Sequence, residues 1–341
     1  MNSNFLRTLL LLSTAFLLTN CSFFQASKHN VKEDGFVYIP SQADFQEVLD
    51  SLSNKLIDSK SFSSYATSKE YPQNIKPGKY KLIKGETNKD LVQRLMTGAQ
   101  EQVPLMIRNE PTIYHLAGSV SKKIEADSAQ IVESILNWAK QKDTDLTEET
   151  VKIYFIPNTY NFYWTTTADK FVERMETEFN KVWTEERQQK AKDMNFSLLE
   201  VFTLASIVQM ESSKIDEQPK VAQVYLNRLK KNMKLQADPT SIYAYRLQNG
   251  FGHKIQRVRK DQLIIPSAYN TYRVTGLPPA PICLPNLSAV DAVLNPEEHT
   301  YIYFCADPDR PGYHSFTSNY AEHQKNAKKY RIWLENRGIE K

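Results

Sequence analysis

Residues 196–211 read FSLLEVFTLASIVQME, and this stretch predicts a helix in the core of a folded domain. Ser197 and Glu200 have the spacing of a capping box, in which each side chain accepts a hydrogen bond from the other residue's backbone. Phe196 and Val201 have the spacing of a hydrophobic staple. Beyond Val201 the segment is apolar on nearly every side, which is typical of a helix surrounded by protein. We therefore expect a buried helix that begins at Ser197.

Glu211 stands at the end of this expected helix. Its side chain follows Leu204, Ile207 and Val208 by seven, four and three residues, so it projects from an apolar stripe. Burial and the negative end of the helix dipole both disfavour the charged carboxylate, and we expect a raised pKa. A carboxyl that keeps its proton near neutral pH suits a general acid at a glycosidic oxygen. The alternative is a glutamate that extends into solvent.

Most glycosidases use two carboxylates that flank the scissile bond. Glu200 lies eleven residues before Glu211 on the same helix face, and at the helical rise this is roughly 16 Å, too far to act. Asp216, Glu217 and Asp238 are close enough in sequence to be possible, but no spacing argues for any of them. The sequence therefore favours a single acid, with a nucleophile supplied by the substrate.

The segment LASIVQME (204–211) resembles the core motif of the endolytic murein transglycosylases, the YceG-like family. Five further motifs follow in family order: VAQVYLNRL (221–229), LQADPT (235–240), PSAYNTY (266–272), GLPP (276–279) and GYHSF (312–316). One departure is Gln209, where the family commonly has glutamate. It leaves Glu211 as the motif's candidate acid and leaves open whether the missing charge affects its pKa.

The resemblance implies lytic transglycosylation, the cleavage of the β-1,4 bond between N-acetylmuramic acid and N-acetylglucosamine. The muramyl 6-hydroxyl attacks its own C1 and leaves a 1,6-anhydro end. Glu211 would be the catalytic acid to the leaving oxygen and then, or in concert, the base to the 6-hydroxyl. The implied partners are peptidoglycan glycan strands, the membrane and the cell-wall synthesis machinery at nascent strands, and no cofactor or metal is implied.

Seven residues in these motifs are candidates for substrate binding: Gln236, Asp238, Thr240, Tyr269, Asn270, Thr271 and His314. Neutral hydrogen-bonding groups suit the hydroxyl and acetamido groups of a sugar, and tyrosine rings suit stacking. Asp238 and Pro239 also predict a helix N-terminus, with Asp238 as the N-cap. The alternative for each is a structural role in its own loop.

The segments before the expected central helix indicate an α+β fold class, with a small LysM-like domain at 36–109. Its expected strands and helices are FVYIP (36–40), ADFQEVLDSLSNKL (43–56), PGKYKLIKG (77–85), TNKDLVQRLMTG (87–98) and QVPLMI (102–107). The segment from Gly78 to Gly98 carries the LysM-like signal for glycan binding. A helical connector is expected at 110–150, and a mixed α/β catalytic domain at 151–341.

Within these later regions, apolar spacing predicts a helical hairpin over 112–148 and a helix from Ala168 to about Arg187. A short strand is expected at 312–316. An amphipathic helix over 319–337, closed by Gly338 as its C-cap, is expected to pack on the catalytic domain.

Residues 1–24 predict an export signal or anchor, because a mostly apolar run of about ten residues precedes Cys21. The residues around Cys21 resemble a lipoprotein cleavage box, in which Asn20 fits imperfectly. A lipidated Cys21 and an uncleaved single-pass helix remain open, and a buried soluble helix is a third alternative. Residues 25–35 read as a linker. The protein is thus expected at the cytoplasmic membrane, with its catalytic domain facing outward.

The composition excludes some classes of protein. The 43 basic and 39 acidic residues leave a net charge of +4, which argues against nucleic-acid binding. Cys283 and Cys305 could pair, although free buried thiols are favoured, and no zinc or thiol-nucleophile motif is present. Two alternatives to the lyase remain: a hydrolase that uses water, and a peptidoglycan-binding or scaffold protein without catalysis.

Overall fold

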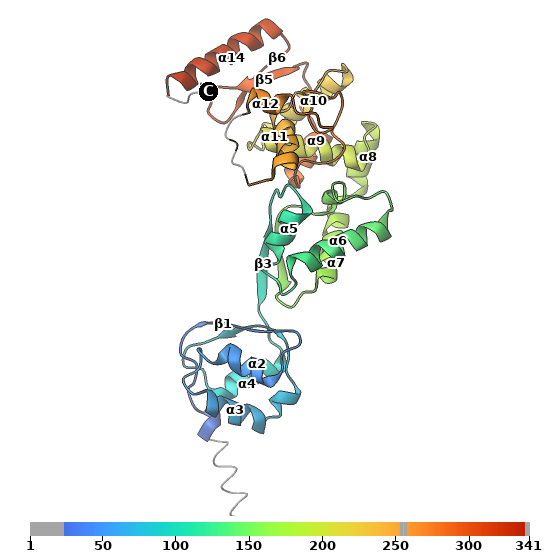
Figure 1. Cartoon of the computed structure of the whole chain (residues 1–341). Coiled ribbons are helices and arrows are strands. Elements are labelled where there is room, and N and C mark those ends of the chain that lie inside the picture. The colour runs from blue at the N-terminus through green and yellow to red at the C-terminus, as the bar shows by residue number, and fades with distance from the viewer. Residues whose placement is uncertain (1–23, 253–254, 256–257, 338–341) are drawn as a thin grey trace, which may run out of the picture. The chain divides into compact units, whose positions relative to one another are not determined.

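The computed structural model describes residues 24–252, 255 and 258–337. They form two compact units of the α+β class, with helices and small two-stranded sheets (Figure 1). Unit 1 contains the described residues up to Leu105 together with 121–126 and 160–167. Unit 2 contains 106–120, 127–159 and the described residues from Ala168 onward.

Unit 1 is built on an antiparallel pair of strands, with Val37 opposite Tyr80. Alternate strand residues are buried, and the helices lie on this buried face (Figure 1). The elements run in the order β1 (Gly35–Ile39), α2 (Phe45–Leu52), α3 (Ser59–Ser68), η1 (Tyr71–Gln73), β2 (Gly78–Leu82) and α4 (Asn88–Thr97).

The predicted strands and α-helices of unit 1 are confirmed, with one omission. Thr87 is the N-cap of α4, since its side chain accepts from the backbone N–H of Asp90. The omitted element is α3, whose sequence SKSFSSYATS is rich in serine, a residue that favours turns and caps. It is nevertheless helical because Phe62 and Tyr65 pack into the core of the unit.

The predicted helical hairpin is also confirmed, as α5 (Ile113–Val120) and α6 (Ser128–Lys142). The next elements are η2 (Val151–Tyr154), β4 (Asn158–Tyr163), which pairs with β3 (Gln102–Ile107), α7 (Ala168–Val182) and α8 (Glu185–Asp193). The prediction that one helix continues to about Arg187 was wrong. The Thr184 side chain accepts from the backbone N–H of Arg187, and it starts α8 as a separate helix.

Helix α9 (Leu198–Glu211) is the centre of unit 2. The capping box between Ser197 and Glu200 is present, and every residue from Val201 to Val208 is buried. The prediction of a helix enclosed by protein is thus confirmed. Its neighbours are α8, α10 (Gln218–Lys230), α11 (Asp238–Asn249) and α13 (Leu287–Leu294), and α12 (Lys260–Leu263) packs on α11.

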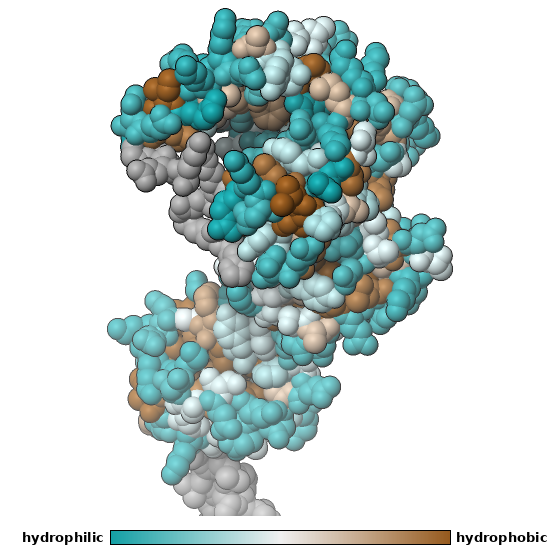
Figure 2. All heavy atoms as spheres, turned by 45° about the horizontal axis from the view of Figure 1, so that its top comes forward, coloured by the Kyte–Doolittle hydropathy of each residue, from teal (hydrophilic) through white to brown (hydrophobic). Residues whose placement is uncertain are grey.

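The C-terminal part of unit 2 is a hairpin, β5 (Tyr303–Ala306) and β6 (His314–Thr317), against which α14 (Tyr320–Glu335) packs. The predicted C-terminal helix is confirmed, with Asn319 as its N-cap. Gly338, the predicted C-cap, lies outside the described residues. Figure 2 shows that the displayed face is mostly hydrophilic, as expected when the apolar residues form interior cores.

The predicted anchor falls almost entirely on residues outside the described part of the chain. Within that part, no helix combines the length and the apolar character needed to cross a membrane. Cys283 is buried, Cys305 is half-buried, and both are free thiols. The favoured prediction of unpaired cysteines is thus confirmed.

Candidate active site

Glu211, the last residue of α9, lines a cavity of about 410 Å³. The walls come from segments far apart in the sequence, namely α10, the start of α11, the β5–β6 hairpin and α14. The lining residues are Glu211, Tyr225, Arg228, Leu235, Gln236, Asp238, Tyr272, Phe304, Cys305, Ala306, His314, His323 and Tyr330. The expected acid therefore lies in a cavity that is lined by aromatic and hydrogen-bonding groups.

The Glu211 carboxyl is held in a form suited to proton donation. Burial raises its pKa to about 7, although the Tyr225 hydroxyl donates a hydrogen bond of 2.7 Å to Oε1 and lowers it. The negative charge of Asp238 raises the pKa further, while His314 and Arg228 lower it. The side chain reaches solvent only in part, because it opens into the cavity and is otherwise surrounded by protein.

Arg228 holds the walls of the cavity together. Its Nε donates to the Ile302 carbonyl at 2.7 Å, and its Nη1 donates to the Leu235 carbonyl at 2.7 Å. Its guanidinium also lies 5.5 Å from the Tyr303 ring centre. One buried cation thus ties α10 to the hairpin and to the segment before α11.

Asp238 contributes a second carboxylate to the lining. The prediction that it caps α11 was wrong, because Ala237 occupies the N-cap position and Asp238 is the first helical residue. Its side chain instead accepts a hydrogen bond of 2.5 Å from the Tyr272 hydroxyl. This contact joins the PSAYNTY loop to the start of α11 at the edge of the cavity.

His314 enters the cavity from β6 and is fixed by Glu217. The two carboxylate oxygens of Glu217 accept the backbone N–H of His314 at 2.7 Å and its Nδ1 at 2.8 Å. Burial raises the pKa of Glu217, but these hydrogen bonds and that from Ser212 outweigh burial and hold the pKa below its usual range. Glu217 is therefore a carboxylate that orients the imidazole.

Of the seven candidates for substrate binding, the structure brings Gln236, Asp238 and His314 to the cavity of Glu211. Thr240, Asn270 and Thr271 are fully buried instead. Their hydrogen bonds are internal, and they fasten the PSAYNTY loop to the start of α11.

Tyr269 is also nearly buried, and its hydroxyl donates to Glu149 at 3.2 Å. Glu149 lies in a second internal network, where it accepts from the Tyr243 hydroxyl and pairs with the fully buried Lys152. These contacts support the loop from behind and do not line the cavity.

Several residues that line the cavity were not predicted as site residues from the sequence. Tyr225 and Arg228 lie in the VAQVYLNRL motif three residues apart, so they share one face of α10. His323 and Tyr330 lie seven residues apart on α14 and likewise share a face. Helical spacing was therefore the available signal, but it did not indicate which face meets Glu211.

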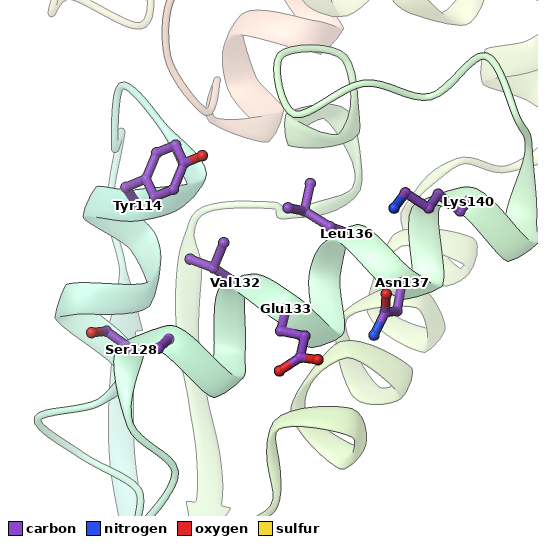
Figure 3. A pocket seen from close by; sticks show the side chains of 8 residues that line it. Tyr114, Ser128, Val132, Glu133, Leu136, Asn137 and Lys140 are labelled. Carbon is purple, nitrogen blue, oxygen red and sulfur yellow. The ribbon is translucent and has the colours of Figure 1, made fainter.

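A second hollow of about 620 Å³ lies over α5 and α6 (Figure 3). Tyr114, Val132 and Leu136 contribute its apolar surface, and Glu133 and Lys140 contribute charge. In the described ranges no cluster of three potential metal ligands occurs, and no side chain that lines this second hollow is among the seven candidates for substrate binding. The cavity of Glu211 is therefore the candidate active site.

Comparison with known proteins agrees with the resemblance that the sequence motifs indicate. The model of the YceG-like family matches residues 37–329. The chain is 28% identical over 337 residues to an endolytic murein transglycosylase of Bacillus subtilis (strain 168), and the match covers 94% of this chain and 91% of that protein.

A second similar protein is an endolytic murein transglycosylase of Streptococcus pneumoniae serotype 2 (strain D39), 27% identical over 295 residues. The match covers 78% of this chain and 52% of the streptococcal protein, so the chain spans about half of that relative. The crystal structure of a yceG-like protein from Listeria monocytogenes shares the fold, with a TM-score of 0.58 at 24% identity over 86% of this chain and 98% of that one.

Proposed function

The chain belongs to the YceG-like family, and from this premise we propose that it is an endolytic murein transglycosylase with Glu211 as its catalytic acid. The observation that carries the proposal is the Glu211 carboxyl, whose pKa is about 7 inside a cavity lined by sugar-compatible side chains. The chain is then a peptidoglycan lyase that cuts within glycan strands.

The geometry supports the following chemistry. Near pH 7 about half of the Glu211 side chains carry a proton. That proton passes to the oxygen between N-acetylmuramic acid C1 and N-acetylglucosamine C4, so the leaving sugar departs neutral. The muramyl 6-hydroxyl attacks C1 and closes the 1,6-anhydro ring. Because the substrate supplies the nucleophile, no second carboxylate has to form a covalent bond.

Product analysis tests this function. The purified chain is incubated with isolated glycan strands, and the new ends are identified by mass spectrometry. We expect 1,6-anhydro ends from the unsubstituted chain, almost none from Glu211→Gln, and unchanged products from the matched control Glu133→Gln. Reducing ends would instead indicate hydrolysis with water, with Asp238 as the available second carboxylate. Binding without new ends would indicate a non-catalytic protein.

We further propose that unit 1 is a LysM-like module that binds glycan strands. The support is its β1–α2–α3–β2 order and its outer strand face, which exposes Phe36 and Tyr38. Exposed aromatic rings suit stacking on sugars. Glu211→Gln protein should co-sediment with insoluble peptidoglycan, and adding Phe36→Ser should weaken this binding. Equal binding by both proteins would contradict the assignment to this face.

We also propose that residues 1–24 hold the enzyme at the outer side of the cytoplasmic membrane, where it acts on nascent strands near the synthesis machinery. The support is the apolar run before Cys21. Membrane fractionation and labelling with a fatty-acid analogue test the anchor. Loss of label in Cys21→Ala would indicate a lipid anchor, while an unlabelled membrane-bound chain would indicate a spanning helix.

A further inference from the structure

The cavity of Glu211 contains a second group that can transfer protons, the His314 imidazole. The two side chains arrive on different elements, Glu211 on α9 and His314 on β6. His314 follows Glu211 by more than a hundred positions in the sequence, so no local pattern indicates that they meet. Their presence in one cavity gives the site an imidazole in addition to its acid.

Glu217 sets which imidazole nitrogen carries hydrogen. A carboxylate has only acceptor atoms, so its contact of 2.8 Å with Nδ1 requires a hydrogen on Nδ1. In the neutral ring Nε2 then has a free lone pair. Nε2 has no hydrogen-bond partner within the described part of the chain, although the residue lines the cavity.

The imidazole is also held in place. Glu217 is only 6% exposed, and its oxygens are fixed by the Ser212 hydroxyl and by the backbone N–H of His314. The Phe304 ring of β5 packs edge-on against the imidazole, with ring centres 5.2 Å apart. This support resembles that of general bases, in which a buried carboxylate fixes the ring and its tautomer.

The proposed reaction has a use for such a group. The leaving oxygen must gain a proton, and the muramyl 6-hydroxyl must lose one. Glu211 can accept the second proton only after it has donated the first, whereas a neutral imidazole can accept it at any stage. We propose that Nε2 of His314 is the base that accepts the proton of the attacking 6-hydroxyl, while Glu211 protonates the leaving oxygen. This inference rests on the proposed transglycosylase function and divides acid and base between two side chains.

The step balances in atoms and charge. The C1–O4 bond breaks first, its electrons pass to O4, and O4 takes the proton of Glu211. O6 then bonds to the electron-poor C1 from the face that O4 has left. The O6 proton passes to Nε2. The cavity then holds a carboxylate and an imidazolium, and transfer of one proton from His314 to Glu211 restores both groups. No proton is gained or lost over the cycle, as the net reaction requires.

The other polar groups of the cavity are poorer bases. Arg228 remains protonated and can only donate. Asp238 accepts the Tyr272 hydroxyl. The second imidazole, His323 of α14, stacks on the Tyr303 ring with centres 5.1 Å apart. In the described ranges no carboxylate accepts a hydrogen bond from the His323 ring, whereas Glu217 accepts one from Nδ1 of His314.

Three substitutions test the inference. In Glu217→Gln the ring stays in place, but an amide N–H that faces Nδ1 favours the tautomer with hydrogen on Nε2, which cannot accept a proton. His314→Ala removes the base. Tyr313→Phe is the matched control, because it loses only a hydroxyl contact to Asp216 beside the pair. The production of anhydro ends is followed for each protein with and without added imidazole.

We expect kcat to fall about 10²-fold or more in Glu217→Gln and His314→Ala while KM changes little, because a positioned base contributes about this factor. Free imidazole should restore part of the activity of His314→Ala and none of that of Glu211→Gln. Tyr313→Phe should behave as the unsubstituted chain. A purely structural role of His314 would give no rescue by imidazole.

Two outcomes overturn the inference. One is a near-normal kcat in both Glu217→Gln and His314→Ala, and the other is a folded His314→Ala protein that imidazole does not rescue. If His314→Ala does not fold, as judged by thermal unfolding, kcat of Glu217→Gln decides. The proposed function fails separately, since an unsubstituted chain that produces no anhydro ends contradicts the function itself. If Glu217→Gln and His314→Ala produce anhydro ends as fast as the unsubstituted chain, only the role of His314 is contradicted.

Discussion

The hydroxyl of Tyr225 donates a hydrogen bond of 2.7 Å to Oε1 of Glu211, from the helix that follows the acid in the sequence. The bond orients the carboxyl and stabilises its charged form, so it opposes the effect of burial on the pKa of Glu211. Tyr225 therefore limits how strongly the acid holds its proton.

Tyr225→Phe should raise the pKa of Glu211 above about 7, since it removes a contact that lowers this pKa. The fall of activity on the alkaline side, where the acid loses its proton, should move to higher pH. At neutral pH we expect a loss on the order of tenfold, about 1.4 kcal/mol, because the carboxyl also loses its orientation. The pH dependence of kcat measures the effect, and an unchanged alkaline limb would contradict it.

Asp238→Asn should act in the opposite direction. The charge of Asp238 raises the pKa of Glu211, so its removal should lower this pKa and move the alkaline limb to lower pH. Asp216→Asn is a matched control, because Asp216 is not among the groups that shift Glu211. Opposite displacements in Tyr225→Phe and Asp238→Asn are the expected pattern, and displacements of equal sign would refute the electrostatic account.

Glu211→Gln should stabilise the fold in a pH-dependent way. The folded chain holds the Glu211 proton with a pKa of about 7, against an ordinary value of 4.5. The free energy of unfolding of the unsubstituted protein is thus highest below pH 4.5. It falls by up to about 3 kcal/mol as the pH rises from there toward 7. Glutamine has no such titration.

Chemical denaturation at pH 4 and pH 8 measures this difference. The variant should be the more stable protein at pH 8, and its advantage should largely disappear at pH 4. An advantage of equal size at both pH values would show that ionisation of Glu211 does not destabilise the folded protein.

The central helix and its acid could be predicted from the sequence because their signals are local. The Ser197–Glu200 box marks where α9 begins, and the apolar run after it predicts burial on all sides. The position of Glu211 at the end of that run predicts its raised pKa. Each of these inferences depends on residues within a few helical turns of one another.

The rest of the cavity depends on tertiary contacts between distant segments. His323 and Tyr330 reach it on α14, a helix that leaves most of its surface exposed and packs on a hairpin. The pairing of His314 with Glu217 spans 97 positions. Asp238 lies one residue from its predicted cap position, and this small shift turns a capping side chain into one that lines the cavity.

Thr271→Val tests whether the buried residues of the PSAYNTY loop contact substrate or only support the cavity. The Thr271 hydroxyl oxygen lies 2.8 Å from that of Thr240 and accepts the backbone N–H of Ala237 at 3.0 Å. Valine has nearly the same shape but leaves that N–H without an acceptor, which should lower the free energy of unfolding by about 1–3 kcal/mol. KM for glycan strands should change little, because the hydroxyl is enclosed by protein. Denaturation and steady-state kinetics on one preparation separate the two roles: a raised KM with undiminished stability would place Thr271 in the sugar-binding surface instead.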